Sequence, residues 1–349
     1  MIKKFFTILI LLFLFSCGDE EKALSSLPSN SNENIFCLGL TELDLTDDTV
    51  TFQIEGNEIE LTKEMDGDNF ILSGTLSMGE EAVELTITSN LNSQGSEGNA
   101  TLLVGAPINI SINSYLKKAS CETEIVDAAG NGASQIITTN PLEETDIANI
   151  SKFRSAAGHD SSDSFETCRS MKHYFQPSSK TNLTNEVYAP FDGIVVSMNT
   201  EEGGGFVDDG ITNQRIAFKP SLASAYQVMF YHIDVIAELN LAPGDTINAG
   251  TLIGYGRLVR VNSDVTDPEA EPSTSNDFDI KVDVLTKDGV RAVSLFNLMT
   301  DSVFAEFSSF TTSKSDLIIS KDVRDADLLT CEGETFTSSG SLLNWLISN

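Results

Sequence analysis

The stretch EVYAPFDGIVVSM, residues 186–198, shows most clearly the pattern that decides the fold of this 349-residue chain. β-branched and aromatic residues stand on both sides of a Pro-Phe-Asp-Gly turn, which predicts two strands joined by a tight turn. The same kind of pattern recurs in RIAFKP (215–220), YQVMFYHIDV (226–235), TLIGYG (251–256) and DFDIKVDVL (277–285). Short helices are expected at 293–304 and in SGSLLNWLIS, 339–348. The second half of the chain is therefore predicted to be mainly β.

The chain divides into two β-rich blocks separated by a stretch without a firm period. Residues 37–126 alternate apolar and polar residues between turn residues, which predicts a small antiparallel β sandwich or barrel. Within them DGDN, residues 66–69, favours a hairpin turn over a calcium loop. Residues 127–147 are rich in glycine, proline and small polar residues and are predicted to be a linker. The second block spans 148–349, and the first, which has no histidine, is interpreted as a spacer or binding module.

The N-terminus has the features of a bacterial export signal. Residues 1–17 place two lysines before an apolar run that is too short to span a bilayer, and they end in Leu-Phe-Ser-Cys, which resembles a lipobox. Cys17 is therefore the expected lipid anchor. Residues 18–36 are polar and predicted to be a flexible tether. These features predict a lipoprotein of the cell envelope, on the periplasmic or surface face of the outer membrane.

The charge of the chain excludes nucleic acid as a partner. The sequence has 21 basic and 52 acidic residues, and loss of the two signal lysines leaves 19 basic residues and a formal charge of −33. Such a field repels polyphosphates, keeps a protein soluble and attracts cations. An acidic, solvated surface is the simplest interpretation.

Export also decides how the remaining cysteines are interpreted. Outside the reducing cytosol, Cys37, Cys121, Cys168 and Cys331 are expected to form two disulfides. Four cysteines allow three pairings. We favour Cys37 with Cys121 and Cys168 with Cys331, because each bond then closes one block and leaves the linker free.

Two of the three histidines lie close together, in AAGHDSSDSFETCRSMKHYF, residues 156–175. His159 and Asp163 stand four residues apart, and an imidazole nitrogen with a carboxylate oxygen is a pairing that suits zinc. In so acidic a chain the spacing also arises by chance, in a solvated loop.

The segments downstream add a family resemblance. VYAPFDGIVVSM (187–198), FYHIDV (230–235), LAPGDTINAGTLIGYG (241–256) and NDFDIKVDV (276–284) follow in the order found in the lysostaphin/LytM-type zinc metallopeptidases, which cut peptidoglycan cross-bridges. The region from Phe153 to Leu298 resembles that family. The resemblance implies an antiparallel β half-barrel with a groove.

The family's site residues transfer only in part. Its HxxxD pair of zinc ligands falls on His159 and Asp163, and the histidine that orients the attacking water falls on His232. Its HxH pair, a catalytic base and the third ligand, falls on Asp277 and Asp279, so both histidines are missing.

Replacement of the HxH pair weakens the implied site. With one nitrogen and two carboxylates, the metal would be a poorer Lewis acid and its water less acidic. Such ligands shift the preference from zinc toward manganese, magnesium or calcium. Asp277 would be a weak general base, because a carboxyl group has an ordinary pKa of about 4.

His173 has two interpretations. It either replaces a lost ligand, or it packs and forms hydrogen bonds near the Cys168 disulfide. The segment between Asp163 and Val187 is longer than the family leads one to expect, so we predict that it folds over the groove, where it either blocks substrate or contributes the missing ligand.

Three functional hypotheses follow. The first is a degenerate LytM-like domain that binds peptidoglycan or regulates a cell-wall hydrolase. The second is an active metal-dependent endopeptidase that cleaves peptidoglycan cross-bridges. The third is a non-enzymatic adaptor with a lipoyl-type hairpin, a fold that carries a similar turn but has no need of the histidines.

Overall fold

The computed structural model describes residues 34–54, 57–78, 81–105, 110–127, 132–178, 185–200, 212–221, 225–257, 259–262, 272–275 and 278–348. The signal segment with Cys17, most of the tether, and Asp277 lie outside the described residues. The predictions made for them stay predictions. None of the described helices has the length and apolar character needed to cross a membrane.

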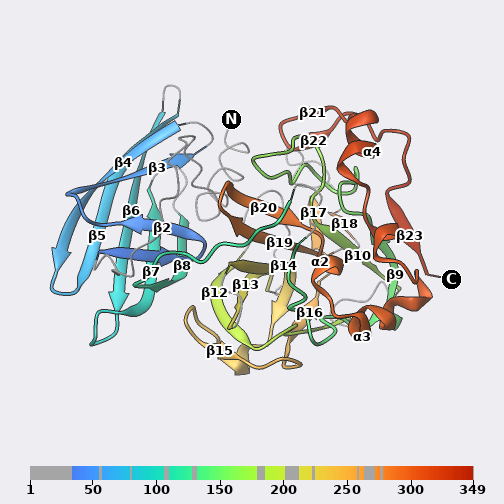
Figure 1. Ribbon diagram of the computed structural model, residues 1–349, viewed down its shortest axis with the longest axis horizontal. Coiled ribbons are helices and arrows are strands. Elements are labelled where there is room, and N and C mark those ends of the chain that lie inside the picture. Colours follow the sequence, from blue (N-terminus) through green and yellow to red (C-terminus); the bar gives the residue numbers. More distant parts are fainter. Residues whose placement is uncertain are drawn as a thin grey trace.

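The first block is an antiparallel meander, drawn in blue and cyan in Figure 1. Consecutive strands β3 to β8 pair in order, and β1 pairs with both β2 and β8. The bounds are β1 Ile35–Leu38, β2 Thr41–Asp44, β3 Thr49–Ile54, β4 Asn57–Asp66, β5 Asn69–Met78, β6 Glu81–Leu91, β7 Glu97–Val104 and β8 Ile110–Lys117. Asp66 pairs with Asn69 across the β4–β5 turn, so the predicted DGDN hairpin is confirmed.

The second block is built on a run of antiparallel strands in the order β23, β9, β10, β19, β14, β13 and β12. Strands β11, β15, β16 and β20 extend it at its margins, and β17–β18 and β21–β22 are separate ribbons. The bounds are β9 Ile147–Ser151, β10 His173–Pro177, β11 Asn185–Tyr188, β12 Gly193–Thr200, β13 Gln214–Pro220, β14 Tyr226–Val235, β15 Thr246–Ile247, β16 Leu252–Gly256, β17 Val259–Asn262, β18 Pro272–Ser275, β19 Phe278–Thr286, β20 Gly289–Val293, β21 Cys331–Glu332, β22 Thr335–Phe336 and β23 Trp345–Ile347.

The described helices are short and follow the last long strand. The predicted helix at 293–304 is present as two pieces, α2 and α3, and Thr300 caps the second by accepting a hydrogen bond from the backbone of Val303. The bounds are α2 Leu295–Leu298, α3 Asp301–Phe304 and α4 Lys321–Ala326, with 3-10 turns η1 Glu144–Asp146, η2 Ala237–Leu239, η3 Ala305–Ser309 and η4 Lys314–Leu317.

The prediction of a helix at 339–348 is wrong. Its residues form β23, which pairs antiparallel with β9 at the margin of the sheet. Leu346 packs against the core while its neighbour Ile347 is exposed, an alternation that suits a strand. The open edge of β9 therefore decides the conformation of this segment.

Each block has its own hydrophobic core. One cluster of buried side chains comes from residues between Phe36 and Leu116, and a larger one from residues between Val126 and Leu317. The fold is thus mainly β, as predicted, and its large antiparallel sheet is open, since it is not closed into a barrel. Described residues of the predicted linker join the second core, where Ile137 and Leu142 are buried.

The two blocks also meet through the sheet itself. Ser114 of β8 pairs with Ser197 of β12, which joins the two sets of strands into one sheet. Both predicted disulfides are confirmed: Cys37 is bonded to Cys121 and Cys168 to Cys331. Each bond lies within one block, so the blocks are linked to each other by backbone pairing and packing rather than by sulfur.

Candidate functional site

Strand β19 presents two different faces. Phe278, Ile280 and Val282 belong to the hydrophobic core, whereas Asp279, Lys281 and Asp283 alternate with them on the opposite face and are also buried. Across the sheet, Tyr174 of β10 and Tyr231 of β14 are both paired with Asp279. Buried charges need partners, so this polar face is where a functional site is expected.

The central group of the polar face is the Lys172 ammonium. Its Nζ lies 3.0 Å from Asp279 Oδ1 and 3.1 Å from His159 Nε2. The rings of Tyr231 and Tyr174 lie 4.7 Å and 5.1 Å from the same nitrogen, measured to their centroids. Two hydrogen-bond acceptors and two aromatic faces therefore surround one buried cation.

These neighbours keep Lys172 charged. Burial alone lowers the pKa of Lys172, but the Asp279 carboxylate, followed by the Tyr174 and Tyr231 phenols, outweighs burial and raises the pKa above its ordinary value. Lys172 is 4% exposed and Asp279 is 0% exposed. The pair is therefore a buried salt bridge, in which neither charge has water to replace its partner.

Lys172 also fixes the state of His159. An ammonium can only donate, so Nε2 of His159 accepts from it, and Nδ1 then carries the proton and donates to the Asp160 carbonyl oxygen at 2.8 Å. The charge of Lys172 and then burial lower the pKa of His159 well below its ordinary value. His159 is thus neutral at neutral pH, and its side chain, 46% exposed, forms the solvent side of the site.

His232 approaches the same carboxylate from β14. Its Nε2 lies 3.8 Å from Asp279 Oδ2, and its Nδ1 lies 3.3 Å from Asn213 Oδ1. Its φ of 58° is in the left-handed region, which a residue with a side chain adopts at a cost in energy. The register of β13 and β14 shifts nearby, between Gln214 and Ile216. This irregular backbone directs the imidazole toward Asp279.

Asp163 has a different environment from the other predicted ligands. One of its carboxylate oxygens accepts from the backbone N–H groups of Phe165 and Glu166, and the other accepts from the N–H of Ala292 at 2.9 Å. Burial raises the pKa of Asp163 although these hydrogen bonds oppose the shift. In this structure the carboxylate joins the loop after His159 to strand β20.

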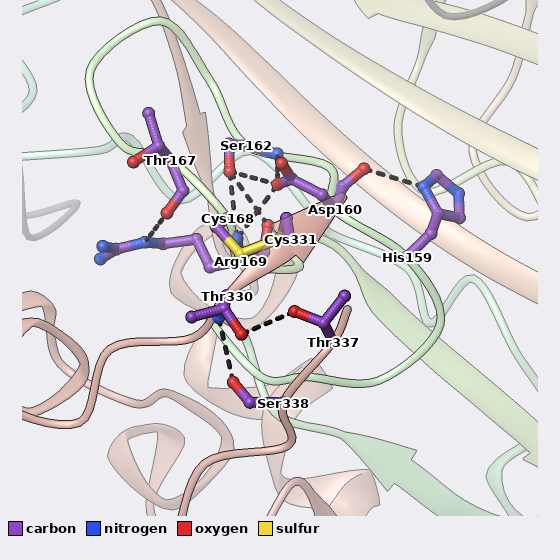
Figure 2. Close-up of a disulfide and its surroundings, with 10 residues drawn as sticks. All are labelled: His159, Asp160, Ser162, Thr167, Cys168, Arg169, Thr330, Cys331, Thr337 and Ser338. Carbon is purple, nitrogen blue, oxygen red and sulfur yellow. Dashed lines mark hydrogen bonds between the residues drawn. A yellow bond between two sulfur atoms is a disulfide. The ribbon is translucent and has the colours of Figure 1, made fainter. Parts of the chain in front are cut away.

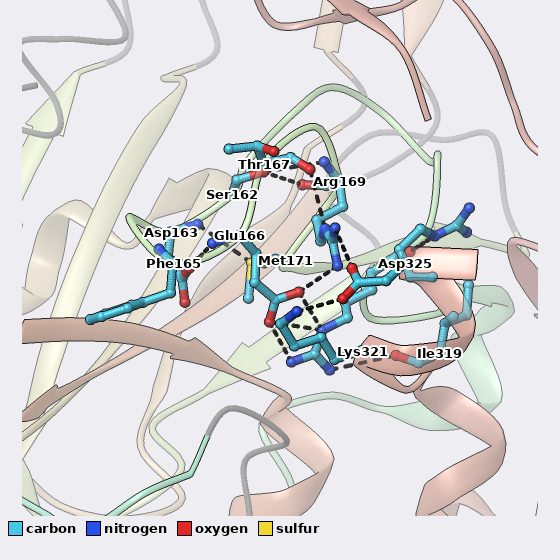
Figure 3. A network of polar contacts seen from close by, with 12 residues as sticks. Ser162, Asp163, Phe165, Glu166, Thr167, Arg169, Met171, Ile319, Lys321 and Asp325 are labelled. Atoms are coloured by element: carbon cyan, nitrogen blue, oxygen red, sulfur yellow. Dashed lines mark hydrogen bonds and ion pairs between the residues drawn. The ribbon is translucent and has the colours of Figure 1, made fainter. Parts of the chain in front are cut away.

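Ion pairs and a disulfide hold the loop that carries His159. Glu166 receives a bidentate contact from Arg154. It also accepts from the guanidinium of Arg169, which reaches Asp325 of α4 (Figure 3). Cys168 is bonded to Cys331 beside the turn that Asp160 and Ser162 stabilise (Figure 2). The disulfide and the Arg169–Asp325 ion pair therefore attach the loop to the C-terminal segment.

His173 lies on the other side of β10, in the core. Its Nδ1 is 2.7 Å from the carbonyl oxygen of Ser151 and its Nε2 is 2.8 Å from Oγ of Ser294, and the Phe296 ring meets it edge-on. Burial lowers the pKa of His173 to about 4. Its packed, hydrogen-bonded environment matches the second of the two interpretations made from the sequence.

The structure therefore brings together two of the predicted metal ligands, and the third has backbone hydrogen-bond partners of its own. His159 and Asp279 face one nitrogen atom, with His232 beside them, while Asp163 serves the loop. Among the described residues no group of three or more histidine, cysteine, aspartate or glutamate side chains is arranged to hold a metal ion. Sequence reasoning missed Lys172. The only available signal was that Lys172 lies two residues before Tyr174. Two-residue alternation places both side chains on one face, which is also the face of Asp279.

Comparisons with protein-family models, with curated proteins and with solved structures found no match for this chain.

Proposed function

We propose that this chain is a cell-envelope lipoprotein whose second block binds peptidoglycan or a cell-wall hydrolase without cutting the polymer. The proposal rests on the resemblance described above and on one observation, the position of Lys172 Nζ between His159 and Asp279. Those are two of the positions to which the resemblance assigns a metal ion. An ammonium supplies the positive charge there instead.

The chemistry of an ammonium favours binding over hydrolysis. A catalytic metal needs an open position for the water that it activates, and a lysine nitrogen offers none. The Nε2 lone pair of His159 is already used to accept from Lys172, and Asp279 neutralises the same charge. Lys172 comes from the long segment between Asp163 and Val187. One expectation from the sequence was that this segment contributes a replacement metal ligand; in the structure it contributes a cation.

The test uses the chain that lacks residues 1–17 and purified peptidoglycan sacculi. We expect the protein to sediment with the sacculi and to release no soluble fragments, with or without added zinc. Metal analysis of the same protein and of His159→Ala should show no stoichiometric metal in either. Release of cross-bridge fragments, together with a metal that His159→Ala loses, would refute the proposal.

One observation favours the second candidate, an active metal-dependent endopeptidase. The strained backbone of His232 directs its imidazole toward Asp279, and such strain is concentrated at functional sites. For this function the Lys172 side chain would have to leave, so that His159 and Asp279 could hold zinc or a harder divalent ion. Lys172→Ala should then gain metal-dependent cleavage of sacculi, an outcome that the binding proposal does not expect.

A further inference from the structure

The charges in the interior differ in sign from those of the whole chain. Of the described residues, eight basic and four acidic side chains are buried, although the sequence has 52 acidic and 21 basic residues. The buried basic residues are Arg154, Arg169, Lys172, Arg215, Lys219, Arg257, Lys281 and Arg324, and the acidic ones are Asp163, Glu166, Asp279 and Asp283. A buried charge is costly unless an opposite charge or a set of hydrogen bonds balances it, so each interior cation needs an explanation.

Three of the four buried carboxylates form ion pairs with other cations. Glu166 is shared by Arg154 and Arg169, and Asp279 pairs with Lys172. Asp283 Oδ1 lies 3.4 Å from Lys281 Nζ. The fourth, Asp163, accepts hydrogen bonds from backbone N–H groups and influences the pKa of Asp283. None of these ion pairs includes the guanidinium of Arg215.

Arg215 is on β13, on the same face as Tyr231, and is 6% exposed. With the Asn199 amide turned so that its oxygen faces the guanidinium, that oxygen accepts from Arg215 Nη2 at 3.0 Å. Nη1 is buried and has no hydrogen-bond partner among the described residues. Arg215 also influences the pKa of Asp283, but no carboxylate in the described part of the chain reaches it within 4 Å.

A second donor lies beside Arg215. The guanidinium carbon is 5.7 Å from the centroid of the Tyr231 ring. Within the described residues, the Tyr231 hydroxyl donates to the sulfur of Met229, at 3.5 Å, and to no better acceptor. Burial raises the pKa of Tyr231, against the opposing effect of Arg215, Lys281 and Lys172, so the phenol keeps its proton. Among the described residues the same face thus has a buried N–H without an acceptor and an O–H with only a weak one.

We propose that Arg215 and Tyr231 form a binding position for a single carboxylate group of a peptide. The choice of a peptide rests on the proposed function, whereas the anion site rests on the structure alone. A planar guanidinium matches a planar carboxylate. A doubly charged phosphate would bring more negative charge close to Asp279 and Asp283 than a carboxylate does. The site therefore selects a monovalent anion within a strongly acidic protein.

The side of the site that faces solvent is marked by His232. Its side chain is 21% exposed and contacts Asn213, which lies two residues before Arg215 in the sequence. His159, 46% exposed, and Lys172 border the same region. A peptide whose terminal carboxylate enters beside His232 would place its preceding residues along His159.

The test compares N-acetylalanine with N-acetylalaninamide, which differ only in the carboxylate, by calorimetric titration of the wild-type chain lacking residues 1–17. We expect the acid to bind at millimolar concentration and to raise Tm, and the amide to do neither. Arg215→Gln should weaken binding of the acid about tenfold or more, since it removes a charged hydrogen bond. Lys219→Gln is the matched control, because it removes a buried charge from the same strand and face and should leave binding unchanged.

Equal binding of acid and amide by the wild type would overturn the proposal, and this comparison needs no variant. Unchanged binding of the acid by Arg215→Gln would overturn it as well. If Arg215→Gln does not fold, Arg215→Lys keeps the charge without the planar guanidinium and should show weaker binding of the acid. Sedimentation with sacculi tests the proposed function separately: wild-type protein that binds the acid but not sacculi refutes the function and leaves the anion site intact.

Discussion

Replacing Lys172 by methionine removes the ammonium that pairs with Asp279 Oδ1 while keeping a side chain of similar length. The two atoms of this pair are 3.0 Å apart, and the residues are 4% and 0% exposed, so water cannot replace the lost ammonium. Breaking one partner of a buried ion pair typically costs about 3–5 kcal/mol. We expect the free energy of unfolding of the second block to fall by that amount.

The assay is urea unfolding under non-reducing conditions, followed by the fluorescence of Trp345. This is the only tryptophan of the chain, and it lies on β23 at the margin of the same sheet, so its signal reports the second block without the first. Lys287→Met is the control, because Lys287 is 65% exposed and pairs only with an exposed aspartate.

A double-mutant cycle separates the pair from general disruption. Asp279→Leu should also destabilise the block, because it leaves Lys172 buried without its carboxylate, whereas Lys172→Met with Asp279→Leu should lie closer to the wild type than either single variant. Additive losses in the double variant, or a loss below about 1 kcal/mol for Lys172→Met, would refute the view that this ion pair organises the polar face.

Three further predictions concern the loop and the core beside the site. Replacing Cys168 and Cys331 by serine should cost about 2–5 kcal/mol of stability and should make the loop between Arg154 and Met171 more sensitive to limited proteolysis. Replacing Cys37 and Cys121 by serine should leave cleavage of that loop unchanged, since the disulfide of this pair lies in the other block. Gly158→Ala should cost about 1–3 kcal/mol more than Gly333→Ala by thermal unfolding. Both glycines have positive φ, but a Cβ on Gly158 would lie 2.1 Å from the Tyr174 ring, whereas one on Gly333 would meet nothing within 4 Å. Equal losses of stability in the two variants would contradict this packing. Burial lowers the pKa of His173 from 6.5 to about 4, so the stability contributed by the neutral imidazole is present above pH 6.5 and is lost as the pH falls toward 4. The difference in Tm between wild type and His173→Gln should therefore become smaller between pH 7 and pH 5. A constant difference would show that His173 does not titrate on unfolding.

Local patterns were sufficient to predict much of the fold. Two-residue alternation gives the strands because successive side chains of a strand point to opposite faces, and this holds whatever the partner strand is. The pairing of the four described cysteines followed from their division between two blocks of sequence. The same local reasoning failed at residues 339–348, since the free edge of β9, which is distant in sequence, decides that segment.

The site was predictable only in part. The resemblance selected His159, His232 and Asp279, and these lie on one polar face, whereas Asp163, four residues from His159, binds three backbone N–H groups of the loop and of β20. Its role depends on where Ala292 lies, and the spacing of two residues in a loop contains no information on that. Lys172 was missed for a related reason: alternation places it on a face, but no local rule says that two tyrosines and a carboxylate from other strands converge on its nitrogen.

The sequence by itself determined the strand-rich character of both blocks and favoured the disulfide pairing that the structure contains, because these depend on the alternation and grouping of residues along the chain. Only the tertiary structure decided which charges lie together in the interior. The free energy of a buried charge depends on groups within a few ångströms of it, and on this face those groups come from the loop after Arg154 and from strands β10, β13, β14 and β19, which span more than a hundred positions of the sequence.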